Sequence, residues 1–316
     1  MVTLFYHGGP RIVTMGVSIE IIIGAAAGLL SAFLYAVSVV IYRSQAEEAH
    51  PLVVSALKMW VALIFMVIIA ILPLGADPLS VPLLAVVILS SSIVLGAVVG
   101  DTVYLASQER IGVTYAFPIS MTYPVLTFAI TIVFLGEPLI AARIIGAVIA
   151  VAGGAVLAME QNRCNGETDC TMPRNVIGIL LAVLTAVFYA VATVLIQVGL
   201  RGYDVDAVTA NLIRVGFGSA IFVPIFAAAW RQGIRVPSLH SAKRIAIAAV
   251  FGMGLGTLLY VFSIRCAGAA ISSVVASAAP LFATPISIHY LRETPTVKTG
   301  IGVLATVIGV VLVVLG

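Results

Sequence analysis

One internal duplication constrains this sequence of 316 residues more than any other feature. Residues 96–157 align with residues 252–313 at a constant shift of 156, without a gap. Many matches are aliphatic and carry little weight, but Tyr104/Tyr260, Pro124/Pro280 and Glu137/Glu293 are not. A second agreement, at a shift of 154, joins the stretch around Tyr35 to the stretch around Tyr189. The chain therefore contains two copies of one structural unit.

The composition places both copies in a lipid bilayer. The chain is 62% hydrophobic and 9% charged, with a mean hydropathy of +1.20, whereas an ordinary soluble domain has about 25% charged residues. Charge-free runs at residues 21–42, 111–136 and 176–200 each reach the roughly 20 residues that a helix needs to cross a membrane. No segment has the alternating pattern of a barrel strand. We predict an all-α polytopic membrane protein, multi-pass in the cell membrane.

Breaks rich in proline, glycine and charge divide the apolar sequence into ten predicted transmembrane helices. Their approximate bounds are residues 19–43, 52–74, 82–106, 112–134, 138–159, 175–199, 207–230, 244–264, 268–290 and 296–316. Residues 1–18 are predicted to be a disordered leader, 19–160 the first five-helix repeat, 161–174 a polar loop and 175–316 the second repeat. Because each repeat has an odd number of spans, the second must be inverted relative to the first, which is typical of alternating-access transporters.

A repeated signature carries a family resemblance. Its residues are Tyr104, Pro124, Leu135-Gly136-Glu137-Pro138, Gly146 and Gly153, and again Tyr260, Pro280, Leu291-Arg292-Glu293, Gly302 and Gly309. In order, spacing and duplication the signature resembles the EamA-type domain of the drug/metabolite transporter superfamily. The resemblance implies a ten-helix secondary transporter or exporter of small metabolites. It also implies a central cavity lined mainly by the first, third and fourth spans of each half. Two departures are Tyr35-Ala36, where many relatives have a Trp-Gly type pair, and Arg292, which replaces a glycine.

Three charged residues lie well inside predicted spans: Lys58, Asp101 and Arg214. At a helix centre each would cost roughly 2.5–3.5 kcal/mol on insertion scales. Lys58 and Asp101 are predicted to lie toward one membrane face and to form an ion pair, which is either structural or part of a substrate or proton-coupling site. Arg214 occupies the position equivalent to Lys58, but Thr257 stands at the position equivalent to Asp101. Its guanidinium could then bind a carboxylate or phosphate of the substrate; pairing with Glu20 or with lipid headgroups is the alternative.

Four tyrosines recur at matched positions: Tyr35, Tyr189, Tyr104 and Tyr260. We predict that they line the substrate cavity together with Asn211 beside Arg214, although tyrosine is also common in interfacial belts. Glu137 and Glu293 are predicted to cap the helices that follow them.

Other function classes lack support. No P-loop, metal-protease or nucleophile-elbow motif occurs, so we predict no enzyme, no cofactor and no metal site. The net charge of +3 is scattered, which predicts no nucleic-acid partner. The expected partners are a small-molecule substrate, the lipid bilayer and a coupling proton or exchanged metabolite, with the chain a monomer or homodimer.

The predicted function is secondary active transport, in the export direction, of a small metabolite such as an amino acid, organic acid or related compound, by alternating access. The alternatives are a membrane channel or receptor and an intramembrane lipid-modifying enzyme. The positive-inside rule favours both termini outside, whereas the family arrangement puts both in the cytoplasm. Two further hypotheses are a disulfide between Cys164 and Cys170, if their loop faces an oxidising compartment, and translation from Met15.

Overall fold

A computed structural model describes residues 18–45, 48, 50–72, 80–164, 175–231, 233–291 and 296–316, and the regular structure in these ranges is entirely helical. The first half contains α1 (Ile19–Ser44), α2 (Pro51–Ile71), α3 (Leu83–Ile93), η1 (Val94–Gly100), α4 (Asp101–Ile111), α5 (Val113–Ser120), α6 (Tyr123–Leu135) and α7 (Ala141–Cys164). The second half contains α8 (Val176–Arg201), α9 (Ala207–Arg231), α10 (Leu239–Ala249), η2 (Val250–Gly256), α11 (Thr257–Ala267), α12 (Ala269–Ala276), α13 (Ala279–Leu291) and α14 (Val297–Leu315).

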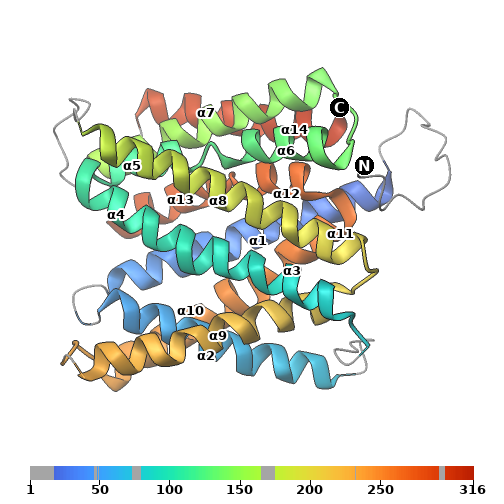
Figure 1. The fold of residues 1–316 in the computed structure, drawn as a ribbon. Helices are drawn as coiled ribbons and strands as arrows, with labels where there is room; N and C mark the ends of the chain where they lie inside the picture. The colour runs from blue at the N-terminus through green and yellow to red at the C-terminus, as the bar shows by residue number, and fades with distance from the viewer. Residues whose placement is uncertain are drawn as a thin grey trace.

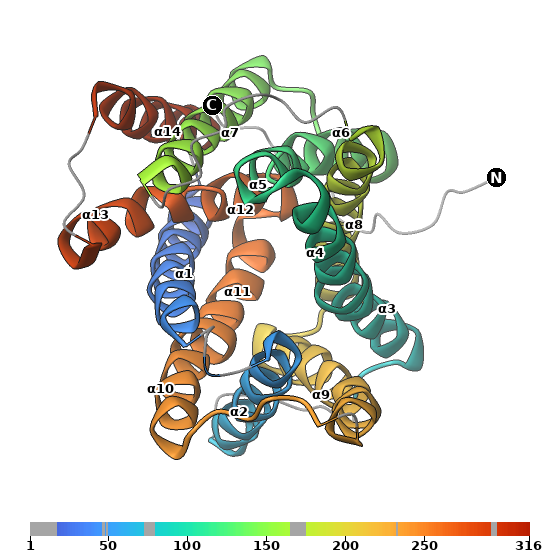
Figure 2. The same cartoon turned by 90° about the vertical axis from the view of Figure 1, so that its left-hand side faces the viewer.

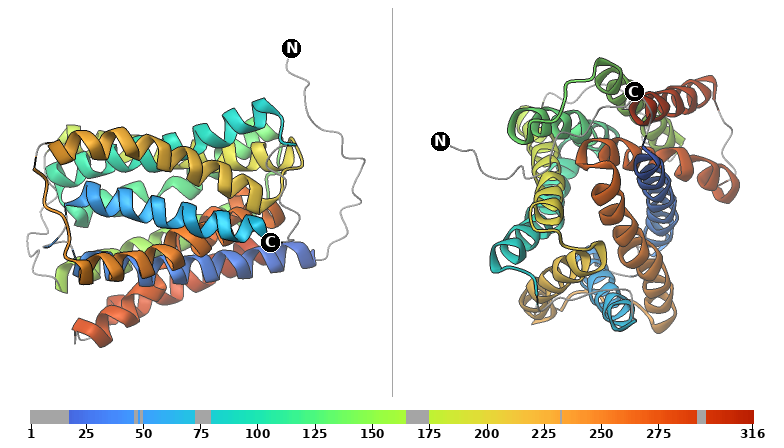
Figure 3. Two further views of the ribbon diagram at one scale, coloured as in Figure 1. Left: turned by 90° about the horizontal axis from the view of Figure 1, so that it is seen from below. Right: turned by 90° about the vertical axis from the view of Figure 1, so that its right-hand side faces the viewer.

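The helices lie side by side along one common direction (Figure 1). Seen from one end, α6, α7 and α14 gather on one side and α2, α9 and α10 on the other (Figure 2), and the view from the opposite end agrees (Figure 3). Within the described residues, nine helices are long and apolar enough to cross a membrane, and residues 269–283 add a shorter apolar helix. Helices α1 and α8 run in opposite directions, as do α2 and α9 (Figure 1).

Several predicted spans differ from the observed helices. The third, with a predicted end at residue 106, continues through η1 and α4 to Ile111, and the eighth begins at Leu239 instead of residue 244. In both regions polar residues interrupt the apolar pattern without ending the helix. Ser238 explains the earlier start, because its side chain accepts a hydrogen bond from the Ser241 N–H and caps α10. Each of these long helices also contains a seven-residue π-helical segment, η1 or η2, at repeat-equivalent positions, which the apolar pattern does not predict.

A repeated glycine separates the spans that follow. Gly112, between α4 and α5, has φ of 75°, and its repeat partner Gly268, between α11 and α12, has φ of 90°. Side chains disfavour this conformation, so glycine allows the chain to reverse without strain at both places. The next spans are each divided in two, α5 from α6 and α12 from α13, just before Pro124 and Pro280.

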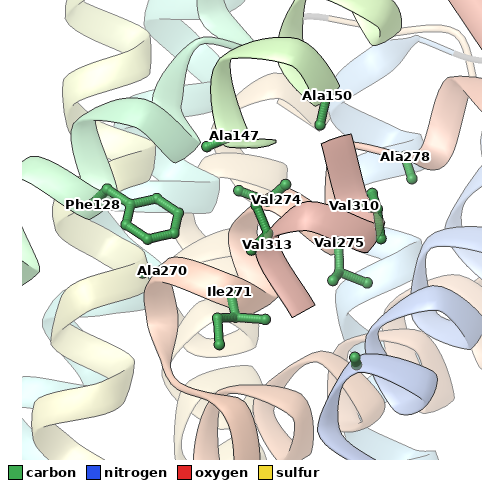
Figure 4. Packing of buried hydrophobic residues seen from close by; sticks show 11 residues of the cluster. Phe128, Ala147, Ala150, Ala270, Ile271, Val274, Val275, Ala278, Val310 and Val313 are labelled. Atoms are coloured by element: carbon green, nitrogen blue, oxygen red, sulfur yellow. The ribbon is translucent and has the colours of Figure 1, made fainter. Parts of the chain in front are cut away.

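The equivalent helices α7 and α14 pack against each other through the repeated glycines. A Cβ built at Gly146 would lie 2.7 Å from the Gly309 carbonyl oxygen, and one at Gly153 would lie 2.8 Å from the Gly302 oxygen. Such close backbone approach is typical of small residues in membrane helices. Around this contact, alanines and valines fill a buried core (Figure 4): Ala147, Ala150, Val274, Val275, Val310 and Val313.

At the end of the bundle where α1 finishes, the turn after α1 contacts the start of α10. The Glu48 carboxylate accepts hydrogen bonds from the hydroxyls of Ser241 and Ser238, the latter at 3.0 Å. These bonds hold the pKa of the exposed Glu48 carboxyl below its ordinary value, and His240 and Arg244 act in the same direction.

Several predictions concern regions outside the described residues. They are residues 1–17 of the leader predicted at 1–18, the start at Met15, most of the polar loop with the Cys164–Cys170 disulfide, and the cap predicted at Glu293.

The glycine contact predicts a position-specific loss of stability. Replacing Gly309 by alanine places a methyl group 2.5 Å from the Gly146 carbonyl oxygen, so the helices must separate, and overpacking of this kind costs about 1–3 kcal/mol. Gly300, on the same helix, has nothing within 4 Å of an added Cβ. Gly300→Ala should therefore match or exceed the wild-type stability. Thermal unfolding of the detergent-solubilised protein measures both, and equal midpoints for the two variants would contradict the packing argument.

The Glu48 contact predicts a pH-dependent contribution to stability. Because folding lowers this pKa, the contribution is present above the unfolded-state pKa of about 4.3 and is lost as pH falls through the lower folded-state value. The difference in unfolding midpoint between wild type and Glu48→Gln should be clear at neutral pH and vanish in acid. Glu109→Gln, at an exposed glutamate on α4, is the control for removal of a surface carboxylate, and an equal trend in both variants would refute the prediction.

Candidate functional site

Asp101 lies inside the bundle and is held by the other half of the molecule. Its carboxylate accepts a hydrogen bond of 2.8 Å from the Tyr189 hydroxyl, near the middle of α8. Lys58 is an electrostatic neighbour of Asp101, but no ion pair within 4.0 Å joins the two in the described part of the chain. The predicted direct Lys58–Asp101 pair is therefore not formed. The tyrosine instead satisfies the carboxylate at closer range.

Further tyrosines lie next to the Asp101–Tyr189 contact in the interior of the bundle. The Tyr123 ring lies 6.0 Å from the Tyr189 ring in an edge-to-face arrangement, at an interplanar angle of 82°. The Tyr123 hydroxyl donates to the Ser273 carbonyl oxygen at 3.3 Å. The Tyr260 hydroxyl lies 3.2 Å from the Thr193 hydroxyl and interacts electrostatically with Arg214. Tyrosines from both halves thus connect Asp101 to Arg214.

Arg214 is buried, with 8% of its surface exposed. Its Nε donates to the Ser92 hydroxyl at 2.9 Å, and one terminal nitrogen donates to the Asn211 side-chain oxygen at 3.3 Å. The Asn211 amide nitrogen in turn donates to the Thr257 hydroxyl at 3.1 Å. Among the described residues no acidic side chain forms an ion pair with Arg214. Its positive charge is hydrogen-bonded but not neutralised.

The structure brings the eight predicted site residues into one neighbourhood. Tyr35 and Tyr104 are electrostatic neighbours of Tyr189, and Tyr35 remains 55% exposed. Sequence reasoning did not select Tyr123, Ser92 or Thr193 as site residues. Tyr123 could have been found because it precedes Pro124 of the repeated signature, whereas Ser92 and Thr193 carry no signal of their own in an apolar helix.

Glu20 and Glu137 lie elsewhere. Glu20 lines a cavity at the end of the bundle where α1 begins, so the alternative that it neutralises Arg214 is wrong. Glu137 does not cap α7: its carboxylate accepts a hydrogen bond of 2.8 Å from the Gln197 amide. Gln197 also accepts from the Ala269 backbone N–H, which ties the end of α6 to the start of α12. The described residues contain no group of three or more His, Cys, Asp or Glu side chains placed to hold a metal ion.

Comparison with protein-family models gives a match over both halves of this arrangement. Residues 22–159 and 176–315 each match the EamA-like transporter family. The chain belongs to this family. Its members are membrane transporters of the drug/metabolite transporter superfamily, and the resemblance inferred from the repeated signature is confirmed. The protein is thus a multi-pass membrane protein of a transporter family.

A solved structure titled "Crystal structure of protein" has the same fold. It superposes with a TM-score of 0.73 at 18% sequence identity, covering 94% of this chain and 98% of the other. At this identity the likeness concerns the fold alone. No curated protein sequence matches the chain.

The Asp101–Tyr189 contact predicts coupled effects of mutation. Tyr189→Phe removes the donor to Asp101 and should lower the free energy of unfolding by about 1–3 kcal/mol. Adding Asp101→Asn should restore part of that loss, giving a coupling energy of about 0.5–3 kcal/mol in a double-mutant cycle. Tyr115→Phe, in α5, is the control and should have little effect. Strictly additive effects of the two site mutations would show that the contact contributes nothing.

Proposed function

We propose that this protein is a secondary active transporter that moves small anionic metabolites, carboxylates or phosphates, by alternating access. The observation that carries the proposal is Arg214, a buried guanidinium in the interior with no acidic partner among the described residues. A guanidinium remains charged at any physiological pH and binds a carboxylate or phosphate through two parallel hydrogen bonds. A substrate anion supplies the countercharge that the fold does not.

The proposed architecture is ten transmembrane helices in two inverted five-helix repeats. The opposite directions of α1 and α8, and of α2 and α9, support inversion (Figure 1). Helices α12 and α13 follow one another between the end of α11 and the start of α14. Together they would form one further crossing, which brings the nine long helices of the described residues to a total of ten. Helix α1 begins and α14 ends toward the same end of the bundle (Figure 1), as an even number of crossings requires.

Alternating access requires contacts between the halves that can be broken and re-formed. Hydrogen bonds of this kind surround the proposed site. Tyr189 in the second half donates to Asp101 in the first, and Arg214 in the second half donates to Ser92 in the first. A substrate anion at Arg214 would compete with Ser92 for the guanidinium, and so would alter one contact that joins the halves.

In this proposal the protein lies in the cell membrane and exports its substrate. Coupling is to a proton or to an exchanged metabolite. Asp101 is the candidate proton carrier, because it is an interior carboxylate with a tyrosine donor. The protein is not an enzyme in this proposal.

Transport by reconstituted vesicles tests the proposal. A panel of radiolabelled carboxylates and phosphates should reveal at least one saturable substrate that supports counterflow. Arg214→Gln should reduce that flux at least tenfold, and Arg214→Lys should restore it only in part, because lysine cannot form the bidentate pair. Arg231→Gln, at the exposed end of the same helix, should transport as wild type.

Thermal unfolding of each variant separates lost binding from lost folding, since a ligand that binds only the folded state raises its unfolding midpoint. Stabilisation of wild type but not of a folded Arg214→Gln by the transported anion is the expected result. Undiminished counterflow in Arg214→Gln would overturn the proposed role of Arg214, and a flux that does not saturate would favour a channel.

A further inference from the structure

A polar cavity that does not include Arg214 lies at the end of the bundle where α1 begins (right in Figure 1). It has a volume of about 240 Å³ and is bounded by α1, α6, α7, α8, α11 and α12. The charged residues in its wall are Glu20, Glu137, Arg143 and Arg201. Its volume is below the range typical of drug-sized ligands, so it suits a small metabolite.

Arg143 provides the anion-binding group of this cavity. Its Nε is buried and has no hydrogen-bond partner within the described residues. It lies in the first turn of α7, where the positive end of the helix dipole also favours an anion. Arg201 is committed to the fold instead, because its guanidinium donates to the carbonyl oxygens of Arg265 and Cys266. Arg143 therefore lines the cavity with a positive charge, and the unpaired state of its buried Nε is unfavourable.

Glu137 provides the opposite charge a few residues away. It is an electrostatic neighbour of Arg143, yet no salt bridge within 4.0 Å joins them in the described part of the chain. Its hydrogen bond from Gln197 uses only part of the acceptor capacity of a carboxylate. Glu20 adds a second carboxylate at the exposed rim. Two charges of opposite sign thus face the same space without neutralising each other directly.

Apart from Ser18 and Cys266, the other residues in the wall are apolar. Phe128 and Ile271 are 7% and 3% exposed and belong to the core around α7 and α14 (Figure 4), and Ile132 lies beside them in the cavity wall. A ligand with an apolar side chain could bury it against these residues. Arg143 and Glu137 line the cavity together with apolar residues. This combination is complementary to a zwitterion that carries an apolar side chain.

We propose that this end cavity is a second binding site, for a zwitterion with an anionic group at Arg143, an ammonium group at Glu137 and an apolar body on Phe128, Ile132 and Ile271. The same charges could come from a free amino-acid-like metabolite or from the headgroup of a phosphatidylethanolamine lipid. The inference that the ligand is cargo, whose carboxylate or phosphate group would then bind Arg214, rests on the proposed transport function. Binding of the zwitterion at the end cavity does not depend on the transport function, and it is measured separately.

Leucine and its two single-charge analogues test the site in the full-length, detergent-solubilised protein. Leucine should bind and raise the unfolding midpoint. The deaminated analogue 4-methylpentanoate and the decarboxylated analogue 3-methylbutylamine should each bind at least tenfold more weakly. The headgroup probe glycerophosphoethanolamine distinguishes the sources: if it displaces leucine and binds more tightly, the zwitterion is a lipid headgroup, and if it does not, the zwitterion is a soluble metabolite. Failure of both zwitterions to bind would overturn the proposal.

Charge-specific variants exclude a purely structural explanation. Arg143→Gln should weaken leucine binding at least tenfold while leaving the weak binding of 3-methylbutylamine unchanged. Glu137→Gln should weaken leucine binding and leave 4-methylpentanoate unchanged or bound more tightly. Asp204→Asn and Arg265→Gln are controls, since they alter a surface ion pair at the same end outside the cavity wall. Equal losses for all ligands in both cavity variants would overturn the assignment of charges.

The central site provides the remaining control. Arg214→Gln should abolish transport but retain leucine binding at the end cavity. Transport without binding at the end cavity would overturn this inference and leave the proposed function intact. Binding at the end cavity without any transport would overturn the proposed function and leave this inference intact.

Discussion

The close approach of α7 and α14 at their repeated glycines is the constraint on which the arrangement of the two halves depends. Inside a bilayer the lipid chains are as apolar as the side chains, so helices gain little from hiding apolar surface and associate through tight packing instead. Here the two repeats meet through equivalent helices, with Gly146 against Gly309 and Gly153 against Gly302. This contact between equivalent helices supports the proposed inversion of one half relative to the other. Other helix pairs also pack closely, since a Cβ at Gly24 would lie 2.9 Å from the Ala267 backbone nitrogen and one at Gly252 would lie 2.5 Å from the Ser38 hydroxyl oxygen.

Polar contacts in the interior follow a different physical rule. A charge removed from water must be compensated, and hydrogen bonds from neutral groups do this less completely than a counter-ion does. Asp101 is held by Tyr189 with Lys58 nearby, whereas Arg214 is held by Ser92 and Asn211 alone. The two halves therefore share a backbone plan but differ in how their buried charges are compensated, and this difference locates the proposed anion site in the second half.

Much of the fold could be predicted from the sequence, because each membrane span can be recognised from its local sequence, as an apolar run with proline and glycine at its ends. The duplication alone pairs Gly112 with Gly268 and Tyr104 with Tyr260. The π-helical segments η1 and η2 could not be predicted, since their hydrophobic composition is that of any membrane helix. The site was predictable as a set of residues but not as a set of contacts. Asp101 and Tyr189 are 88 positions apart, and only the packing of α8 against α4 decides that tyrosine and not Lys58 contacts the carboxylate.

The single substitution that distinguishes the halves most is Thr257 at the position equivalent to Asp101. An aspartate there would sit beside Asn211, whose amide already contacts both Thr257 and Arg214, and would neutralise the guanidinium from within the protein. Threonine supplies a hydroxyl acceptor to Asn211 and orients it, so that the Asn211 oxygen faces Arg214 while the positive charge remains. On the proposed mechanism the second half offers a site for an anion because it has Thr257 where the first half has a carboxylate, and that carboxylate, Asp101, has a separate role in coupling.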